Sequence, residues 1–202
     1  MKILNFIYLI LDKISWFYHR LNYNIYSSKY DIHKTFNYNG KGILFHGDGE
    51  IVIKENSYIG RYSYLQTSYS QKIQIGKSVS ISHLVYIYTK SNIANQDFKT
   101  KGINNEFSIK KGNVIIGNYC WIGAKVFINP GIEIGENTVV GANSVVTRNL
   151  PPNAIVGGIP AKVISFKSYL NEQEVYDLSK QYYSVLSDSL KLNLSDNKKI
   201  EN

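Results

Sequence analysis

Residues 116–151 read IGNYCW-IGAKVF-INPGIE-IGENTV-VGANSV-VTRNLP, a stretch that repeats itself every six residues. An aliphatic residue leads each unit, Gly or Asn usually follows it, and a small or aliphatic residue takes the fifth position. A helix repeats every 3.6 residues and a strand every two, so neither produces this period. A short strand followed by a tight corner does, if each coil has three flat sides. The period therefore predicts a parallel β-helix built from hexapeptide repeats.

The repeat also predicts which side chains fill the interior. The leading aliphatic residue points inward from each side, and the fifth residue fills the space at the corner. Gly and Asn are expected where the backbone turns, because they adopt positive φ at little cost. The fifth positions are Cys120, Val126, Ile132, Thr138, Ser144 and Leu150. Cys120 is accordingly interpreted as a packing residue and not as a nucleophile.

The stretch from Asn113 to Ile164, NVIIGNYCWIGAKVFINPGIEIGENTVVGANSVVTRNLPPNAIVGGIPAKVI, resembles the hexapeptide-repeat acyltransferases. Within that superfamily it is most similar to the maltose, galactoside and capsular-sugar O-acetyltransferases. The resemblance extends more weakly back to about Ile51. It implies an all-β solenoid with a left-handed coil, although the right-handed crossover is the physical default. It also implies a homotrimer whose clefts are shared between subunits.

Three regions are expected along the 202 residues. Residues 1–42 form an N-terminal helix and a Tyr/Asn-rich connector, residues 43–164 form the β-helix, and residues 165–202 form a C-terminal helix and tail. The hexads are interrupted at residues 88–113, and an insertion at one corner of a solenoid becomes a loop on one face. Residues 168–190 show helical spacing, with Asn171 as the candidate N-cap.

The N-terminal segment MKILNFIYLILDKISWFYHRL places its apolar residues on one stripe of a helix. Its apolar run is too short to span a bilayer, and no small-residue cleavage site follows it. The first interpretation is a helix that packs on the β-helix or on a neighbouring subunit. The alternative is a helix on a membrane surface, with Lys2, Lys13 and Arg20 near the headgroups. The chain is therefore expected in the cytoplasm, with attachment to the membrane periphery left open.

Composition restricts the partners. The formal net charge is +8, but no Lys/Arg cluster interleaves with aromatic residues on one element, so nucleic acid is not expected. The excess charge is either diffuse and solvated or attracts an anionic ligand such as coenzyme A. A single cysteine excludes a disulfide framework and fits a reducing compartment. Four scattered histidines do not predict a metal site.

Acetyl transfer from a thioester to a sugar hydroxyl needs a base, donors for the tetrahedral oxyanion, and a slot for the pantetheine arm. In the family the base is a His in a motif like I-Y-(T/D)-x-x-H at the start of the loop. Residues 87–92 read IYTKSN here, so Asn92 stands in the place of that histidine. His83, at a corner one hexad before the loop, is the predicted catalytic base, because the pKa of histidine lies near working pH.

Other groups remain candidates for the base. His46 lies in a turn of the first coil, whereas His19 and His33 are far in sequence from the coil that borders the loop. Asp97 and Glu106, both in the loop, are the carboxylate alternatives. Asn92 and Asp97 are also the predicted substrate contacts.

The resemblance implies an acetyl-CoA site along the later coils. Two Gly-Ala pairs lack bulk, so the pantetheine arm can lie against the backbone, and two cationic side chains would meet phosphates. Trp121 lies near this cleft in the family, although an outward aromatic residue at a subunit contact is an equal interpretation. The predicted cofactor-binding residues are Trp121, Gly123, Ala124, Gly141, Ala142, Thr147, Arg148, Pro160 and Lys162.

The leading hypothesis is an acetyl-CoA-dependent O-acetyltransferase that acts on a sugar hydroxyl during the synthesis of a surface polysaccharide, capsule or lipopolysaccharide. An N-acetyltransferase of an amino sugar is the nearer alternative. A catalytically silent hexapeptide-repeat scaffold is the other, because Asn92 cannot act as a base at neutral pH. The sequence does not predict which sugar accepts the acetyl group.

Overall fold

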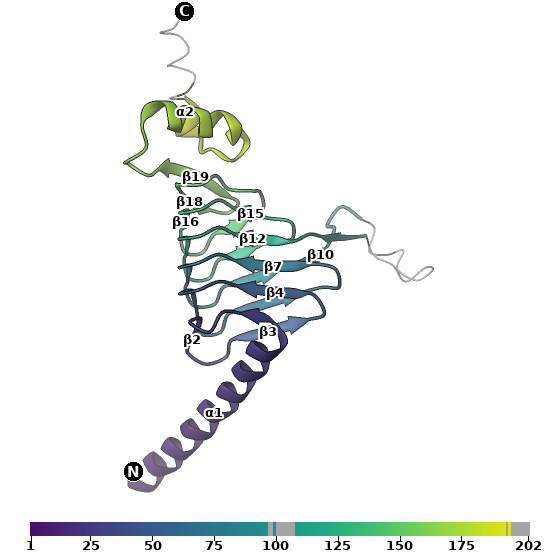
Figure 1. The fold of residues 1–202 in the computed structure, drawn as a ribbon, viewed down its shortest axis with the longest axis vertical. Coiled ribbons are helices and arrows are strands. Elements are labelled where there is room, and N and C mark those ends of the chain that lie inside the picture. The colour runs from purple at the N-terminus through teal and green to yellow at the C-terminus, as the bar shows by residue number, and fades with distance from the viewer. Residues whose placement is uncertain (97–98, 100–107, 193, 195–202) are drawn as a thin grey trace, which may run out of the picture.

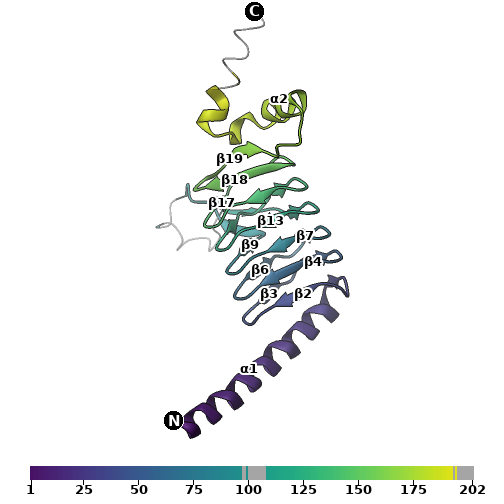
Figure 2. The same cartoon turned by 90° about the vertical axis from the view of Figure 1, so that its left-hand side faces the viewer.

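The computed structural model describes residues 1–96, 99, 108–192 and 194. Stacked three-sided coils form a solenoid between two helical ends (Figure 1). Helix α1 (Lys2–Lys29) lies at one end, and α2 (Glu172–Gln181) with the short 3-10 helix η2 (Tyr183–Val185) lies at the other. In the view turned by 90°, α1 leads away from the lowest coil (Figure 2). The predicted class, an all-β solenoid with a helix at each end, is confirmed.

Three sheets form the sides of the solenoid. Sheet A contains β1 (Asp31–Ile32), β4 (Glu50–Ile53), β7 (Lys72–Ile75), β12 (Val114–Ile116) and β15 (Glu133–Ile134). Sheet B contains β2 (Asn37–Asn39), β5 (Tyr58–Gly60), β8 (Ser80–Ile81), β13 (Trp121–Ile122), β16 (Val139–Val140), β18 (Ala154–Gly158) and β19 (Ala161–Phe166). Sheet C contains β3 (Leu44–Gly47), β6 (Tyr64–Thr67), β9 (Tyr86–Tyr88), β14 (Phe127–Ile128) and β17 (Val145–Val146). Their strands pair in parallel, except that β18 and β19 form an antiparallel hairpin.

The predicted interior positions are buried. The residues that lead the hexads are Ile116, Ile122, Ile128, Ile134, Val140 and Val146, and each is at most 1% exposed. The fifth positions from Cys120 to Leu150 are buried at the corners as well. Each fully buried aliphatic side chain contributes about 1.5–3 kcal/mol, so this regular column strongly stabilises the later coils.

The glycines in the second position of the hexads do not lie at the turns, contrary to the prediction from positive φ. Glycines in the second position of a hexad, such as Gly117, do not have positive φ; that conformation falls in the fourth position, at Tyr119 (φ 59) and Lys125 (φ 58) for example. A Cβ built on Gly117 would lie 2.6 Å from the backbone nitrogen of Glu136 in the next coil. The second position is therefore glycine because the coils pack closely there, and the chain turns two residues later.

The expected connector between the first helix and the β-helix is largely structured. α1 continues to Lys29, and β1 and β2 pair with β4 and β5. The β-helix therefore begins at Asp31, earlier than the predicted boundary at residue 43. The last turns of α1 cover the first coil, because Tyr23 is buried and its ring stacks on Tyr38 with centroids 4.4 Å apart.

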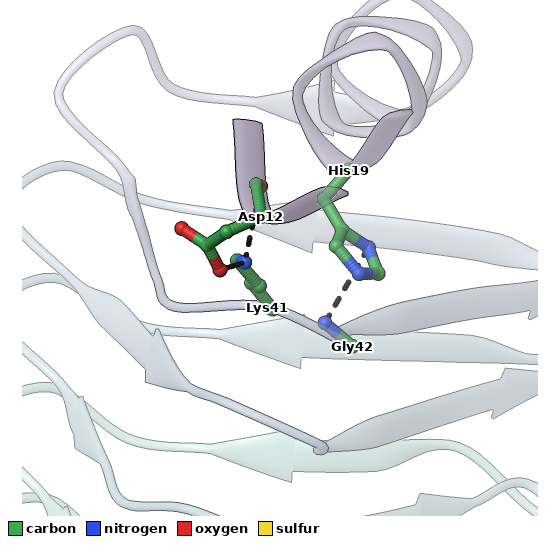
Figure 3. A network of polar contacts seen from close by, with 4 residues as sticks. All are labelled: Asp12, His19, Lys41 and Gly42. Carbon is green, nitrogen blue, oxygen red and sulfur yellow. Dashed lines mark hydrogen bonds and ion pairs between the residues drawn. The ribbon is translucent and has the colours of Figure 1, made fainter. Parts of the chain in front are cut away.

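Most of α1 does not pack on the coil. Within the described residues, Tyr23 is its only buried side chain. The contacts form a short network in which Lys41 is paired with Asp12 and the Gly42 N–H donates to His19 Nδ1 at 3.5 Å (Figure 3). Burial, and then the charge of Lys41, lower the pKa of His19. The expectation that the helix packs along its own β-helix is therefore wrong for most of its length.

The insertion and the C-terminal helix also differ from expectation. The insertion begins and ends as an antiparallel ribbon of β10 (Lys90–Asn92) and β11 (Ile109–Lys111), which projects from the coil in Figure 1.

Asn171 caps α2 through a complete capping box with Glu174, as predicted. The helix ends at Gln181 and not near residue 190, because the chain turns so that Val185 and Leu186 become buried.

Candidate active site

His83 lies at the corner where β8 ends and β9 begins, between sheets B and C. Its side chain is exposed, and the turn continues with Leu84 in the left-handed region (φ 60). A Cβ built on Gly60, in the coil below, would lie 2.4 Å from His83 Nδ1. The imidazole thus rests directly on the backbone of Gly60, and glycine at that position leaves the space for it.

Several of the predicted residues follow His83 along one edge of the solenoid. The Lys125 N–H donates to the carbonyl of His83 at 3.0 Å, and the Asn143 N–H donates to that of Ala124 at 2.9 Å. His83, Ala124 and the residue before Asn143, Ala142, therefore occupy the same corner in successive coils. We call this row the B/C edge. It ends at Gly158, whose N–H donates to Ser144 Oγ at 3.2 Å.

The two Gly-Ala pairs on the B/C edge are not equivalent. Gly123 is buried, and a Cβ there would lie 2.6 Å from the backbone nitrogen of Ala142. Coil packing therefore explains the small size of Gly123 without a ligand, and its place in the cofactor site stays a prediction. Gly141 is half-buried and Ala142 is exposed, while Ala124 is half-buried. The accessible part of the predicted slot is therefore Ala124, Gly141 and Ala142.

Other predicted residues lie on the opposite edge of sheet C. Thr147 and Arg148 follow β17, and Arg148 is exposed. Asn92 is exposed at the end of β10, where it pairs with Ile109. Within one chain, sheet C separates all three from His83. Asp97 and Glu106 lie outside the described residues.

Sheet C carries an outward row of aromatic rings that the sequence reasoning missed. Tyr64, Tyr86 and Phe127 are aligned by the register of β6, β9 and β14. Tyr88 lies edge-on to Phe127 and to Tyr64, with centroids 5.1 Å and 5.7 Å apart. Burial, followed by its tyrosine neighbours, raises the pKa of Tyr88. The signal lay in the residues just before or after the buried Leu65, Ile87 and Ile128, which alternation directs outward.

The remaining predicted cofactor residues lie on sheet B, from its middle strand β13 to the β18–β19 hairpin at the end of the solenoid. Trp121 is 54% exposed on sheet B. Pro160 is exposed in the turn between β18 and β19. Lys162 is half-buried on β19, and its Nζ lies 3.3 Å from Asp188 Oδ1. A phosphate that binds Lys162 must therefore compete with this carboxylate.

The other histidines and the cysteine have local roles. His33 Nδ1 lies 2.9 Å from Thr35 Oγ1, and His46 is exposed on sheet C beside Tyr64. Cys120 is buried, and its thiol donates to the carbonyl of Gly135 at 3.1 Å. Burial raises the pKa of the Cys120 thiol to about 11, which agrees with the packing interpretation. No three His, Cys, Asp or Glu side chains of the described residues form a group able to hold a metal.

The chain is similar to known bacterial transferases in both its repeat pattern and its overall sequence. Residues 113–148 match the family profile described as bacterial transferase hexapeptide (six repeats). The putative lipopolysaccharide biosynthesis O-acetyl transferase WbbJ of Escherichia coli (strain K12) is 30% identical over 142 residues, which cover 68% of this chain and 67% of WbbJ. The chain belongs to the hexapeptide-repeat acyltransferase family.

Two sugar O-acetyltransferases are also similar to this chain. The galactoside O-acetyltransferase of Escherichia coli (strain K12) is 34% identical over 63% of this chain, and the alignment spans only 59% of that relative. The solved structure of a maltose O-acetyltransferase from Clostridium difficile 630 is 33% identical, with a TM-score of 0.52 over 67% of this chain and 72% of the other. The family match at residues 113–148 covers the hexads from Val114 to Arg148.

Proposed function

We propose that this protein transfers an acetyl group from acetyl-CoA to a sugar hydroxyl, in the synthesis of a surface polysaccharide, capsule or lipopolysaccharide. Family membership and the printed activities of the sugar O-acetyltransferase relatives support the reaction class. The observation that carries the proposal is the B/C edge. There a histidine with an exposed side chain is followed, coil by coil, by the small residues Ala124 and Ala142.

His83 is the proposed general base. Because Nδ1 faces the backbone of Gly60, we assign proton transfer to Nε2. Nε2 takes the proton of the sugar hydroxyl as its oxygen attacks the thioester carbonyl. The tetrahedral intermediate then collapses, the C–S bond breaks, and the thiolate of coenzyme A receives that proton. Direct transfer needs no acyl-enzyme, which agrees with the burial of Cys120.

Acetyl-CoA is proposed to lie along the B/C edge. The pantetheine arm would run past Ala124, Gly141 and Ala142 toward the β18–β19 hairpin, where Pro160 and Lys162 lie. Lys162 would contact a phosphate as a charge-assisted donor. The exposed Trp121 on sheet B would flank the arm.

The distribution of the predicted residues supports a shared site. His83 lies on one edge of sheet C, whereas Asn92, Thr147 and Arg148 lie on the other. One copy of the chain cannot place both edges around one ligand, but a second copy packed against the prism can. We therefore propose a homotrimer in which Thr147, Arg148 and Asn92 of a neighbour complete the cleft, with Asn92 toward the acceptor.

The test is thiol release from acetyl-CoA by the full chain with a panel of sugars, amino sugars and glycan fragments, followed by NMR of the product. We expect release with a sugar that bears only hydroxyls, and an acetyl ester in the product. An amide formed only with amino sugars would contradict O-transfer and favour the N-acetyltransferase. If acetyl-CoA binds but no acceptor in the panel releases thiol, the silent scaffold is favoured.

A further inference from the structure

α1 meets the coil along one narrow line of side chains. Up to Tyr26, this line consists of Asp12, Trp16, His19, Tyr23 and Tyr26; Ser27 and Lys29 add contacts in the last turn. The first five are spaced alternately by four and three positions, so they share one face of the helix. Tyr23 anchors this face, because its hydroxyl donates to the carbonyl of Gly40 at 2.7 Å. The opposite face of α1 therefore points away from the solenoid.

That opposite face is apolar and uncovered in the chain. Its central residues and exposed fractions are Ile3 77%, Ile7 47%, Ile10 43%, Ile14 59%, Phe17 64% and Leu21 46%. Phe6 and Leu4 widen it, so that the apolar arc spans roughly 160° at 100° per residue. Large exposed apolar patches mark sites that bind another protein or a membrane, so this face of α1 is expected to bind a partner.

The charges on α1 are distributed unevenly. Its single acidic residue, Asp12, faces the coil and is paired with Lys41 (Figure 3). Lys2, Lys13 and Arg20 are exposed and lie within roughly 20° of one another, along one flank of the apolar arc. The charged side chains of α1 that border the uncovered face are therefore all positive.

We propose that α1 lies flat on an anionic lipid surface, with its apolar arc among the acyl chains and its basic flank at the headgroups. A broad apolar face bordered by Lys and Arg is the pattern of interfacial helices. No helix of the described residues is long and apolar enough to cross a bilayer. The coil-facing line lies opposite the arc, so the solenoid stands away from the lipid while α1 is embedded.

A second copy of the helix fits the same face less well. The central residues Ile3 to Leu21 follow a heptad spacing, which would place Lys13 and Arg20 beside the seam. In a parallel bundle, the positions that meet them on the next helix are Tyr18 and Ile25, and neither is acidic. A helix bundle would therefore partly bury Lys13 and Arg20 without acidic partners, whereas anionic headgroups would neutralise their charges.

Flotation of the full chain with vesicles tests the proposal. We expect it to float with vesicles of phosphatidylcholine containing phosphatidylglycerol, and to bind pure phosphatidylcholine far more weakly. The pair Ile10→Asp and Ile14→Asp should abolish flotation. Lys13→Gln with Arg20→Gln should weaken binding about thirtyfold, because each basic residue contributes about fivefold near an anionic surface. The matched control is Lys54→Gln with Lys180→Gln, two exposed lysines of the body, which should float like the wild type.

Three outcomes would overturn the proposal. The first is a wild-type chain that remains unbound with both vesicle types. The second is unchanged flotation of the Ile10→Asp and Ile14→Asp variant, with its unfolding transition checked by circular dichroism to show an intact coil. The third is a wild-type chain that does not bind vesicles, together with an Ile10→Asp and Ile14→Asp variant whose oligomer has a lower mass in solution. That result would assign the face to a second copy of the chain.

Discussion

At the scale of single residues, Gly60 is the position that sets the place of the proposed base. Gly60→Ala puts a Cβ 2.4 Å from His83 Nδ1 and 2.7 Å from the Ser82 carbonyl carbon. The turn must shift, so we expect a loss of about 1–3 kcal/mol in the free energy of unfolding and a fall in kcat of at least tenfold.

Gly76→Ala is the matched control for Gly60→Ala. Its Cβ would lie 2.6 Å from Asn118 Oδ1 and 2.7 Å from the Asn118 nitrogen, an equivalent clash at the corner between sheets A and B. Denaturant unfolding should show a similar loss of stability in both variants. Only Gly60→Ala should lower kcat, and an equal effect of both variants on kcat would remove Gly60 from the positioning of His83.

Cys120 makes stability depend on alkaline pH. Burial raises the pKa of its thiol to about 11, above the value of about 8.5 expected in the unfolded chain. The folded chain holds this proton more tightly, so its contribution is complete below about pH 8.5 and is lost as the pH rises through about 11. The loss amounts to about 3 kcal/mol.

Thermal unfolding of the wild type and Cys120→Ala between pH 8 and pH 11 measures this contribution. The tyrosines titrate in both proteins, so the difference between the two curves isolates the thiol. The wild type should lose its advantage as the pH rises. Parallel curves over this range would contradict the assignment.

The residues also show how far the sequence could be read. The leading and fifth positions of each hexad could be predicted because burial dictates their chemistry. The positive φ of Tyr119 and Lys125 could not, since neither residue type prefers that conformation and only the stacked neighbours impose it. The aromatic row on sheet C required the register between coils, which a single repeat does not contain.

At the scale of elements, the β18–β19 hairpin and the C-terminal segment share one ion pair. Lys162 and Asp188 are both partly exposed, so their pairing contributes at most about 1 kcal/mol. Asp188→Asn should free Lys162 for a phosphate and lower the KM for acetyl-CoA about two- to fivefold. Lys162→Ala should raise it about tenfold.

Steady-state kinetics at low ionic strength distinguish these effects. Lys54→Ala removes an exposed lysine far from the hairpin and should leave the KM unchanged. A KM that is insensitive to both Lys162→Ala and Asp188→Asn would exclude Lys162 from the coenzyme A site.

Element boundaries were less predictable than element types. The apolar pattern of α1 is interrupted in its last turns by the polar residues Asn22, Asn24, Ser27 and Ser28. The helix nevertheless continues, because Tyr23 and Tyr26 pack these turns against the first coil. Strands of two or three residues, such as β1 and β2, carry too little pattern to be found without their partners. α2 was located by its cap, but its end depends on burial of Leu186 beside Val163.

At the scale of the whole molecule, the proposed site needs two copies of the chain. Light scattering should give the mass of a trimer. His83→Ala and Arg148→Ala change opposite edges of sheet C, so subunits that each lack one group can complement each other. After co-refolding equal amounts, about a quarter of the clefts should contain both groups.

Activity of the co-refolded mixture above that of either variant alone is the expected result. It should be measured at low acetyl-CoA, where Arg148→Ala has its largest effect. A monomeric mass, or a mixture no more active than the average of its two parents, would contradict a cleft shared between subunits.

In the proposed reaction the transfer takes place at the B/C edge, with His83 as the base. The most direct measurement is kcat of His83→Ala against the wild type and against His46→Ala, whose imidazole lies two strands away on sheet C. We predict a fall of about 10²- to 10⁴-fold for His83→Ala with an unchanged KM for acetyl-CoA, and a kcat near that of the wild type for His46→Ala. An unchanged kcat for His83→Ala would exclude His83 as the base.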